Sequence, residues 1–169
     1  MREISINDLQ KTIPSLTAGQ RFALTGDANI LFPVDCEYLK MLLKKGEPLP
    51  FETKGAVIVL AVVTTDEEKN VVSCAAWPSL IAEDVCMELI SQGAAAIVGT
   101  GVKSKRFHET LCENGTVYLC MTGGAGAIMA EYIKYSESMG RIKAIKLESM
   151  PLIVAMDSNG GSVFPTDSI

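Results

Sequence analysis

The sequence predicts an α/β fold with a mostly parallel core sheet and added antiparallel strands. Three observations predict it: short apolar segments alternate with amphipathic ones, the run at 56–63 (AVIVLAVV) lacks polar alternation, and several short strand-like segments close the chain. A strand–helix–strand order favours parallel pairing, and an apolar run without alternation is typical of a strand covered on both faces. With 169 residues, 48% of them hydrophobic, we expect a single domain over residues 1–169.

The expected elements follow from apolar spacing and turn residues. The strands are expected at 21–25, 56–63, 71–74, 94–99, 116–121, 142–147, 152–156 and 162–164. The helices are expected at 34–45, 80–92, 104–113 and 125–138. Gly26 is expected to end the first strand and Gly46 the first helix, whereas the polar stretch 64–70 (TTDEEKN) indicates a loop or hairpin tip. The sequence Asp-Ser-Asn-Gly at 157–160 predicts a turn.

Four strand ends are candidate ligand sites, because ligands of parallel α/β sheets bind at the carboxyl ends of the strands. These ends are Thr25-Gly26-Asp27, Cys74 to Ser79, Gly99-Thr100-Gly101 and Thr122-Gly123-Gly124. Glycine at such an end lets the backbone approach a ligand, and the unpaired N–H groups of a helix start favour an anion. The candidate ligand-binding residues are therefore Thr25, Gly26, Asp27, Ser79, Thr100, Gly101, Gly123 and Gly124.

The glycine-rich segment TGGAGAIMA (122–130) allows two interpretations. Small residues at a strand–helix turn serve either close packing of the helix on the sheet or binding of an anion. The segment does not match the Gly-x-Gly-x-x-Gly pattern of dinucleotide sites, and no acidic strand end follows at the expected distance. A dinucleotide cofactor is therefore not expected, and packing and anion binding both stay open.

Composition excludes several classes of function. Fifteen Lys and Arg against twenty Asp and Glu give a net charge of −5, which argues against a nucleic-acid-binding face. The longest apolar run, Ala56–Val63, is far shorter than the roughly 20 residues that span a bilayer. The first ten residues, MREISINDLQ, carry acidic and amide groups where a signal peptide has an apolar stretch. We therefore expect a cytoplasmic protein that binds neither nucleic acid nor membrane.

The five cysteines and the single histidine do not predict a metal site in this chain. The cysteines are odd in number and contain no Cys-x-x-Cys pair, so we expect buried, reduced thiols. Cys36 lies near a helix start, where a thiol pKa is lowered, but it lacks an evident histidine partner for nucleophilic catalysis. The basic residues Lys103, Lys105 and Arg106 beside His108 indicate either a solvated helix start or an anion site.

Read together, the segments resemble a known family. The stretch TGDANILFPVDCEYLKMLLKKGEPLPFETKGAVIV, the helix AAWPSLIAEDVCMELISQG, the turns VGTGVKS and YLCMTGGAGAIMA, and the segment KAIKLESMPLIVAMDSNGGSVF carry the resemblance. In this order they are similar to the β subunit, or C-terminal domain, of the iron–sulfur fumarate hydratases and L-tartrate dehydratases. The resemblance covers nearly the whole chain and implies a swivelling β/β/α domain.

The resemblance also implies a reaction and a partner. Members of the family add water reversibly across the carbon–carbon double bond of a dicarboxylate. A separate α subunit or domain holds a [4Fe–4S] cluster through three cysteines, and one iron acts as a Lewis acid. The β part supplies arginines, a threonine-containing turn and a lysine. The resemblance therefore implies an iron–sulfur α partner, no cofactor bound by this chain itself, and a homo-oligomer formed through the β part.

Several family residues are substituted in this sequence. Phe32 and Pro33 stand where the family has Arg-Asp, and Cys36 stands where it has a histidine. The turn Gly-Pro-Thr-Thr-Ser-x-Arg corresponds to residues 75–81, of which only the serine is kept, and Thr100 replaces the lysine of the Gly-Lys-Gly turn. Burying a dicarboxylate without cationic partners costs several kcal/mol per charge. The usual dicarboxylate-binding and catalytic residues are therefore expected to be missing.

Three hypotheses about function follow. The first is a hydro-lyase β-subunit-like protein with a diverged active site. The second is an active hydro-lyase subunit for an altered substrate, in which Lys103, Lys105 or Arg106 replaces the lost cations and an α partner holds the cluster. The third is a non-enzymatic binding or assembly module whose glycine turns serve packing alone. A small carboxylate that raises the melting temperature would eliminate the third hypothesis.

Overall fold

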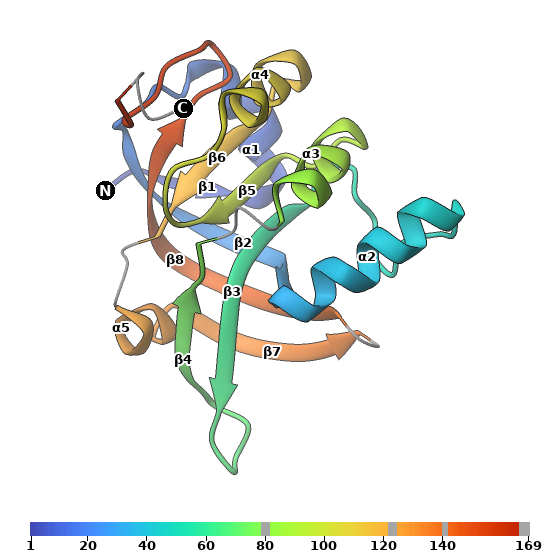
Figure 1. Ribbon diagram of the computed structural model, residues 1–169. Helices are drawn as coiled ribbons and strands as arrows, with labels where there is room; N and C mark the ends of the chain where they lie inside the picture. The colour runs from blue at the N-terminus through green and yellow to red at the C-terminus, as the bar shows by residue number, and fades with distance from the viewer. Residues whose placement is uncertain (79–81, 122–124, 140–141, 166–169) are drawn as a thin grey trace.

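Five strands pair in a closed ring at the centre of the protein. The computed structural model describes residues 1–78, 82–121, 125–139 and 142–165. In the order in which they pair, the ring strands are β2 (Arg21–Leu31), β3 (Val57–Thr65), β5 (Ala96–Gly99), β6 (Val117–Cys120) and β8 (Ile142–Met156). The first four are parallel to one another. The long strand β8 runs antiparallel to both β6 and β2 and thereby closes the ring (Figure 1).

Three further strands extend the ring. The short β1 (Glu3–Ser5) adds in parallel to β2, β4 (Val71–Ala76) is antiparallel to β3, and β7 (Ile133–Met139) is antiparallel to β8. The predicted α/β class is confirmed as a mixed fold in which parallel and antiparallel strands share one sheet.

Helices pack against both faces of the parallel strands. The helices are α1 (Ile6–Thr12), α2 (Pro33–Lys45), α3 (Glu83–Ser91), α4 (Lys105–Asn114) and α5 (Gly126–Ala130), and a 3₁₀ turn spans Ile13–Ser15. In Figure 1, α2, α3 and α4 lie together on one side of β3 and β5, with α5 apart from them beside β4. The molecule thus has a helical layer, a parallel sheet and an antiparallel layer formed by β8 and β7.

The core consists of two clusters, one on each face of the parallel strands. Val57 and Val59 of β3 belong to the cluster that includes side chains of β8 and α1, whereas Ile58 and Leu60 pack against α2, α3 and α4. All four side chains are fully buried. Both faces of the strand are covered, which explains why the run at 56–63 shows no polar alternation.

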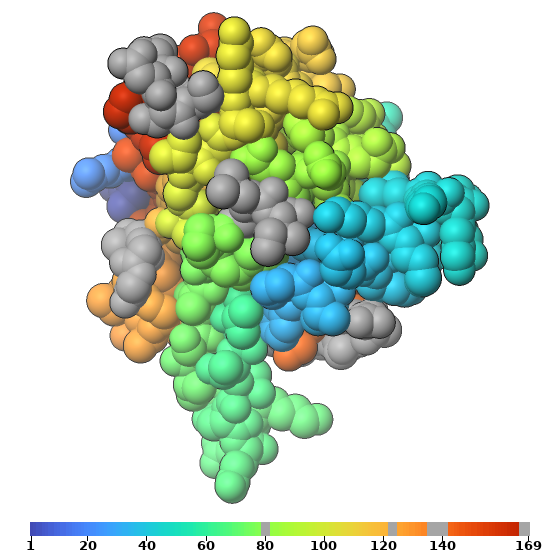
Figure 2. Space-filling model, in the orientation of Figure 1, coloured from blue at the N-terminus to red at the C-terminus, as the bar shows by residue number. Residues whose placement is uncertain are grey.

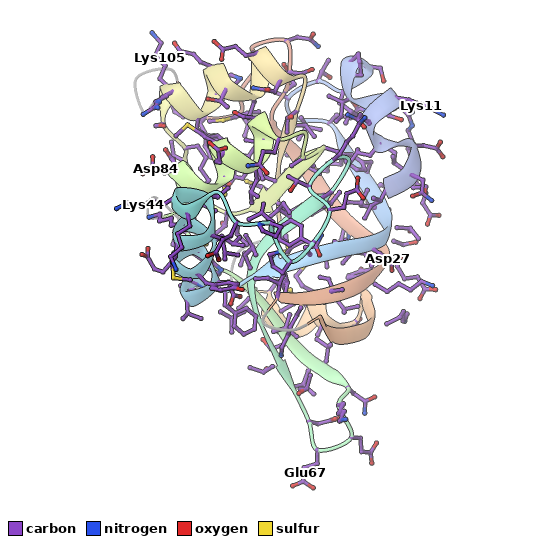
Figure 3. The ribbon with its side chains drawn as sticks, turned by 90° about the vertical axis from the view of Figure 1, so that its right-hand side faces the viewer. Lys11, Asp27, Lys44, Glu67, Asp84 and Lys105 are labelled. Atoms are coloured by element: carbon purple, nitrogen blue, oxygen red, sulfur yellow. The ribbon has the colours of Figure 1, made fainter. Side chains whose placement is uncertain are left out.

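Several predicted elements are confirmed at these positions. The helix α2 ends where Gly46 adopts the left-handed conformation (φ = 67°) expected of a helix-ending glycine. The polar stretch 64–70 forms the tip of the β3–β4 hairpin, which projects from the body (Figure 2), and Figure 3 shows Glu67 at its far end. In the tip, Asp66 accepts hydrogen bonds from the backbone N–H and the side-chain amide of Asn70. Asp157 closes the predicted turn by accepting the N–H groups of Asn159 and Gly161.

The prediction that the first strand ends at Gly26 is wrong. The strand β2 continues to Leu31, because its pairing with β8 shifts register after Leu24 and resumes with Gly26 opposite Leu147. Beyond the bulge, the buried residues Ala28 and Ile30 resume strand alternation. The glycine therefore marks an irregularity inside a strand and not its end.

The chain after residue 125 also differs from the expectation. The helix predicted at 125–138 ends at Ala130, and β7 replaces its second half by pairing with β8. The strands predicted at 142–147 and 152–156 are one continuous strand, with Ser149 at φ = 54° between them. The strand predicted at 162–164 is reduced to an isolated bridge between Met156 and Ser162. The differences have one cause: pairing between segments distant in the sequence decided the structure here, and the local pattern did not.

The first fifteen residues form structure that the sequence pattern did not predict. Leu9 and Ile13 are buried in the core cluster that α1 shares with β8, and Ser5 caps α1 by accepting the N–H of Asn7. Within the part of the chain that the structure describes, no helix has the length and apolar character needed to cross a bilayer.

Candidate functional site

The carboxyl ends of the parallel strands form one edge of the sheet. Leu31 and Leu60 are paired neighbours on β2 and β3, and Thr100 follows β5 directly. The segment after β4 crosses this edge, since Trp77 donates its backbone N–H to Leu60 and Pro78 forms a bridge with Thr100. This strand-end edge, defined by Phe32, Trp77, Pro78, Thr100 and Gly101, is where a ligand of a parallel sheet is expected.

Thr25, Gly26 and Asp27 do not belong to the strand-end edge, contrary to the prediction. They lie within β2, six residues or fewer before its last residue, Leu31. Figure 3 places the exposed Asp27 on the side of the molecule away from α2, α3 and α4. A Cβ atom at Gly26 would lie 2.9 Å from the Cβ of Ile6. The glycine is therefore explained by packing between β2 and α1.

Thr25 has a structural role at the junction of three strands. Its hydroxyl donates a hydrogen bond to Glu3 Oε1 at 2.5 Å and accepts one from the backbone N–H of Ser149 at 2.9 Å. The Ser149 hydroxyl donates to the same Glu3 oxygen at 3.1 Å. Hydrogen bonds from Thr25 and Ser149 lower the pKa of the Glu3 carboxyl, because they stabilise its charged form. Thr25 thus joins β1, β2 and β8.

Thr100 and Gly101 do lie at the strand-end edge, as predicted. Both of their carbonyl groups accept hydrogen bonds from buried side chains: Lys103 Nζ donates to Thr100 O at 3.3 Å, and the Tyr118 hydroxyl donates to Gly101 O at 3.1 Å. Gly101 adopts φ = 79°, which residues with a side chain rarely adopt. The turn is therefore held from below by two side chains, and its backbone conformation requires glycine.

Lys103 is buried, and the interpretation of this lysine as part of a solvated helix start is wrong. It is 2% exposed, and its ammonium lies 5.1 Å from the ring centroid of Tyr118. The neighbouring residue Glu83 is 8% exposed, and its carboxylate accepts a hydrogen bond from the backbone N–H of Ser104 at 2.9 Å. Burial lowers the pKa of Lys103, while the nearby Cys86 and Glu83 side chains act in the opposite direction.

Tyr118 and Glu83 belong to this buried group, although the sequence analysis did not select them. Tyr118 lies on β6 opposite Ile97, its ring packs edge-on against Phe107 with centroids 5.6 Å apart, and burial raises the pKa of its hydroxyl. A tyrosine in a strand with two buried faces needs a hydrogen-bond partner for its hydroxyl. That requirement was a usable signal in the sequence VYLC. The burial of Glu83 depends on the position of Ser104 and has no comparable local signal.

The other end of the strand-end edge is aromatic. Phe32 precedes α2, and Lys143 of β8 lies over its ring at 5.4 Å from the centroid. The Trp77 indole donates to Leu31 O at 3.0 Å and packs against the helix-side core, as its predicted structural role requires. The predictions for Ser79, Gly123 and Gly124 lie outside the described residues.

The cysteines do not form a reactive or metal-binding group. Burial raises the pKa of the Cys36 thiol to about 11, so the nucleophilic interpretation of Cys36 is not supported. All five cysteines are free, and the described ranges contain no group of three or more Cys, His, Asp or Glu that could hold a metal ion. The expectation that this chain itself binds no cofactor stays a prediction.

One cavity lies at the carboxyl end of β6, and another lies along α4. One, of about 270 Å³, lies beside the end of β6, and its lining includes Cys120, Arg21 and Pro151. The other, of about 340 Å³, lies on α4 and is lined in part by His108 and Cys112, which are one helical turn apart. The buried Nε2 atom of His108 has no hydrogen-bond partner among the described residues.

Comparisons with known proteins agree with the resemblance stated above. Residues 1–167 match the protein family described as Fumarase C-terminus. The chain is 32% identical over 179 residues to a protein of Methanocaldococcus jannaschii described as "Putative L(+)-tartrate dehydratase subunit beta". That match covers 96% of this chain and 91% of the relative. The resemblance to the β subunits of iron–sulfur fumarate hydratases and tartrate dehydratases is thereby confirmed, and the chain belongs to the Fumarase C-terminus family.

Proposed function

We propose that this chain is the β component of a two-component hydro-lyase in which the usual dicarboxylate-binding and catalytic side chains are absent. Family membership over residues 1–167 supports the first part. The second part is supported by the strand-end edge, where Phe32, Trp77 and Thr100 stand at positions for which the resemblance implies arginine, threonine and lysine. One observation carries the proposal. The strand-end edge has the position of a ligand site in a parallel sheet, but its side chains differ from those that the resemblance implies there.

A separate α subunit completes the proposed enzyme. The relative in Methanocaldococcus jannaschii is described as a subunit beta, which implies a partner subunit. The described cysteines of this chain do not form a cluster-binding group, so the partner is the proposed location of the [4Fe–4S] cluster. The order of layers, with helices, parallel sheet and antiparallel strands, supports the swivelling β/β/α assignment. A homo-oligomer formed through this domain and a cytoplasmic location complete the proposal.

A second candidate is an active subunit for an altered carboxylate substrate. Two lysines favour it: the buried Lys103 lies below the Thr100–Gly101 turn, and Lys143 lies beside Phe32 at the end of β2. An ammonium group near a bound carboxylate offsets part of the cost of removing the carboxylate from water. In this candidate, the lysines replace the family's cations from different positions in the chain.

Turnover measurements distinguish the two candidates. The chain is mixed anaerobically with its cluster-bearing partner and assayed with fumarate, L-tartrate and the monocarboxylate crotonate. A fumarate hydratase reconstituted in the same way is the positive control. The first candidate predicts no turnover of any of the three, and the second predicts hydration of crotonate without turnover of the two dicarboxylates. Rapid turnover of fumarate or L-tartrate would show that the usual dicarboxylate chemistry is present and would contradict the proposal.

A further inference from the structure

The Thr100–Gly101 turn directs its two carbonyl groups into the protein. Their hydrogen-bond donors, Lys103 Nζ and the Tyr118 hydroxyl, belong to side chains that are at most 2% exposed. In a trans peptide unit, the carbonyl of one residue and the N–H of the next point in opposite directions. The N–H groups of Gly101 and Val102 therefore point away from the buried donors and toward the outside of the turn.

These two N–H groups have no acceptor in the described structure. Neither donates a hydrogen bond to a backbone carbonyl of residues 1–78, 82–121, 125–139 or 142–165, and the side-chain hydrogen bonds of the turn within these ranges use its carbonyl groups. Val102 is 38% exposed, and Gly101 carries no side chain that could cover the turn. Successive N–H groups on one side of a turn form a concave site that binds anions. The geometry of the turn therefore provides two donors for one anionic oxygen or carboxylate.

The charge beneath the turn favours the same kind of ligand. The Lys103 ammonium is buried, and no carboxylate of the described residues lies within ion-pair distance of it. Glu83, the acidic group that faces it from α3, is engaged by the N–H of Ser104. A buried charge without an ion-pair partner is unfavourable, and an anion at the turn would offset part of this cost. This observation is independent of the direction of the N–H groups.

We propose that the N–H groups of Gly101 and Val102 form a subsite for a substrate carboxylate, and that Lys103 and Tyr118 are the residues that position it. Lys103 and Tyr118 act through the backbone, by fixing the two carbonyl groups and so the direction of the N–H groups. Lys103 additionally supplies a positive charge below the turn. The inference deepens the second candidate, the active subunit for an altered carboxylate substrate, and rests on that candidate for the identity of the ligand as a substrate. It explains how the edge can hold a carboxylate although Thr100 replaces the family's lysine.

Amide chemical shifts of the isolated, ¹⁵N-labelled chain test the subsite directly. Crotonate, fumarate and inorganic phosphate are titrated separately. The proposal predicts saturable shifts of the Gly101 and Val102 signals with crotonate, and at least tenfold weaker binding both of fumarate, whose second carboxylate lacks a cationic partner, and of phosphate. Equal or tighter binding of phosphate would overturn the assignment to carboxylates. Carboxylates that leave both signals unchanged would overturn the subsite itself.

Two variants test the positioning residues. Lys103→Met and Tyr118→Phe should each raise the dissociation constant of crotonate at least tenfold, whereas the controls Lys44→Met, at an exposed position in the last turn of α2, and Tyr132→Phe should change it less than twofold. Tyr118→Phe keeps the ring and leaves Lys103 in place, so it remains informative if Lys103→Met does not fold. Unchanged affinity in the folded Tyr118→Phe variant would contradict the positioning role. None of these results depends on a partner subunit, so they separate failure of the subsite from failure of the proposed function.

Discussion

Two Thr-Gly segments of this protein look alike in the sequence and differ in the structure. Thr25-Gly26 and Thr100-Gly101 each follow an apolar strand, and both were predicted to be strand ends. The first lies inside β2, where Gly26 avoids a clash with Ile6 and Thr25 joins three strands. The second lies at the true end of β5, where two N–H groups lack partners in the described structure.

The difference shows what a glycine after an apolar segment can and cannot indicate. It indicates a backbone conformation or a close approach that a side chain would prevent. Whether the strand ends there depends on neighbours from elsewhere in the chain, which for Gly26 are α1 and β8. The experiments that follow separate the structural segment from the proposed binding segment, in order of expected effect.

The largest effect is expected from Gly26→Ala. The new Cβ would lie 2.9 Å from the Cβ of Ile6, and φ at this position is 137°. Backbone strain and overpacking together should lower the free energy of unfolding by about 3 to 5 kcal/mol. Urea denaturation measures the loss. Gly19→Ala is the matched control, since φ is 88° but nothing lies within 4 Å of the new Cβ, and it should cost only about 1 to 2 kcal/mol. Equal losses in the two variants would contradict the packing explanation.

The buried thiols should make the protein less stable at alkaline pH. Burial raises the pKa of Cys36 and of Cys74 to about 11, from an ordinary value of 9.0. Between these values the unfolded chain releases protons that the folded chain retains, so stability falls as the pH rises from about 9 to 11. Each thiol should contribute about 1 kcal/mol to the loss by pH 10.

Urea denaturation at pH 7.5 and pH 10 measures this loss, and a Cys36→Ala, Cys74→Ala double variant should lose about 2 kcal/mol less than the original protein. The same pH dependence in both proteins would show that these two thiols ionise readily in the folded state. It would reopen the interpretation of Cys36 as a nucleophile.

Tyr118→Phe should have a moderate effect on stability and a large one on binding. The buried Gly101 carbonyl loses the donor that lies 3.1 Å away, which should lower the free energy of unfolding by about 1 to 2 kcal/mol. Tyr132→Phe removes a hydroxyl from a partly buried tyrosine away from the turn and should change it by less than about 0.5 kcal/mol. Thermal and urea denaturation of both variants provide the comparison. An equal loss of stability in the two variants would show that the Tyr118 hydroxyl does not stabilise the turn.

The smallest effect is expected from Thr25→Val. This change removes one hydrogen bond to Glu3 and one from Ser149 at a partly exposed position, and should cost about 1 kcal/mol. It should leave the response of the Gly101 amide to crotonate unchanged. A variant of normal stability that no longer binds crotonate would show that Thr25 takes part in binding. It would contradict the assignment of a structural role to Thr25-Gly26.

Local patterns predicted the parts of the fold whose cause is local. Gly46 ends α2, the polar tip separates β3 from β4, and the helix expected at 104–113 is α4. The sequence did not predict β7, because the segment after Ala130 becomes a strand only by pairing with β8. Nor did it predict the burial of Lys103, since that requires α3 and β6 to enclose the loop after β5.

Anaerobic purification of the tagged protein from its own cells tests the proposed two-component hydro-lyase most directly. The proposal predicts that a second polypeptide co-purifies in a fixed ratio, together with acid-labile sulfide and about four iron atoms per pair of the two polypeptides. The tag alone, expressed in the same cells, is the control. Recovery of the protein without a partner and without iron, under conditions that keep other iron–sulfur enzymes of these cells intact, would contradict the account.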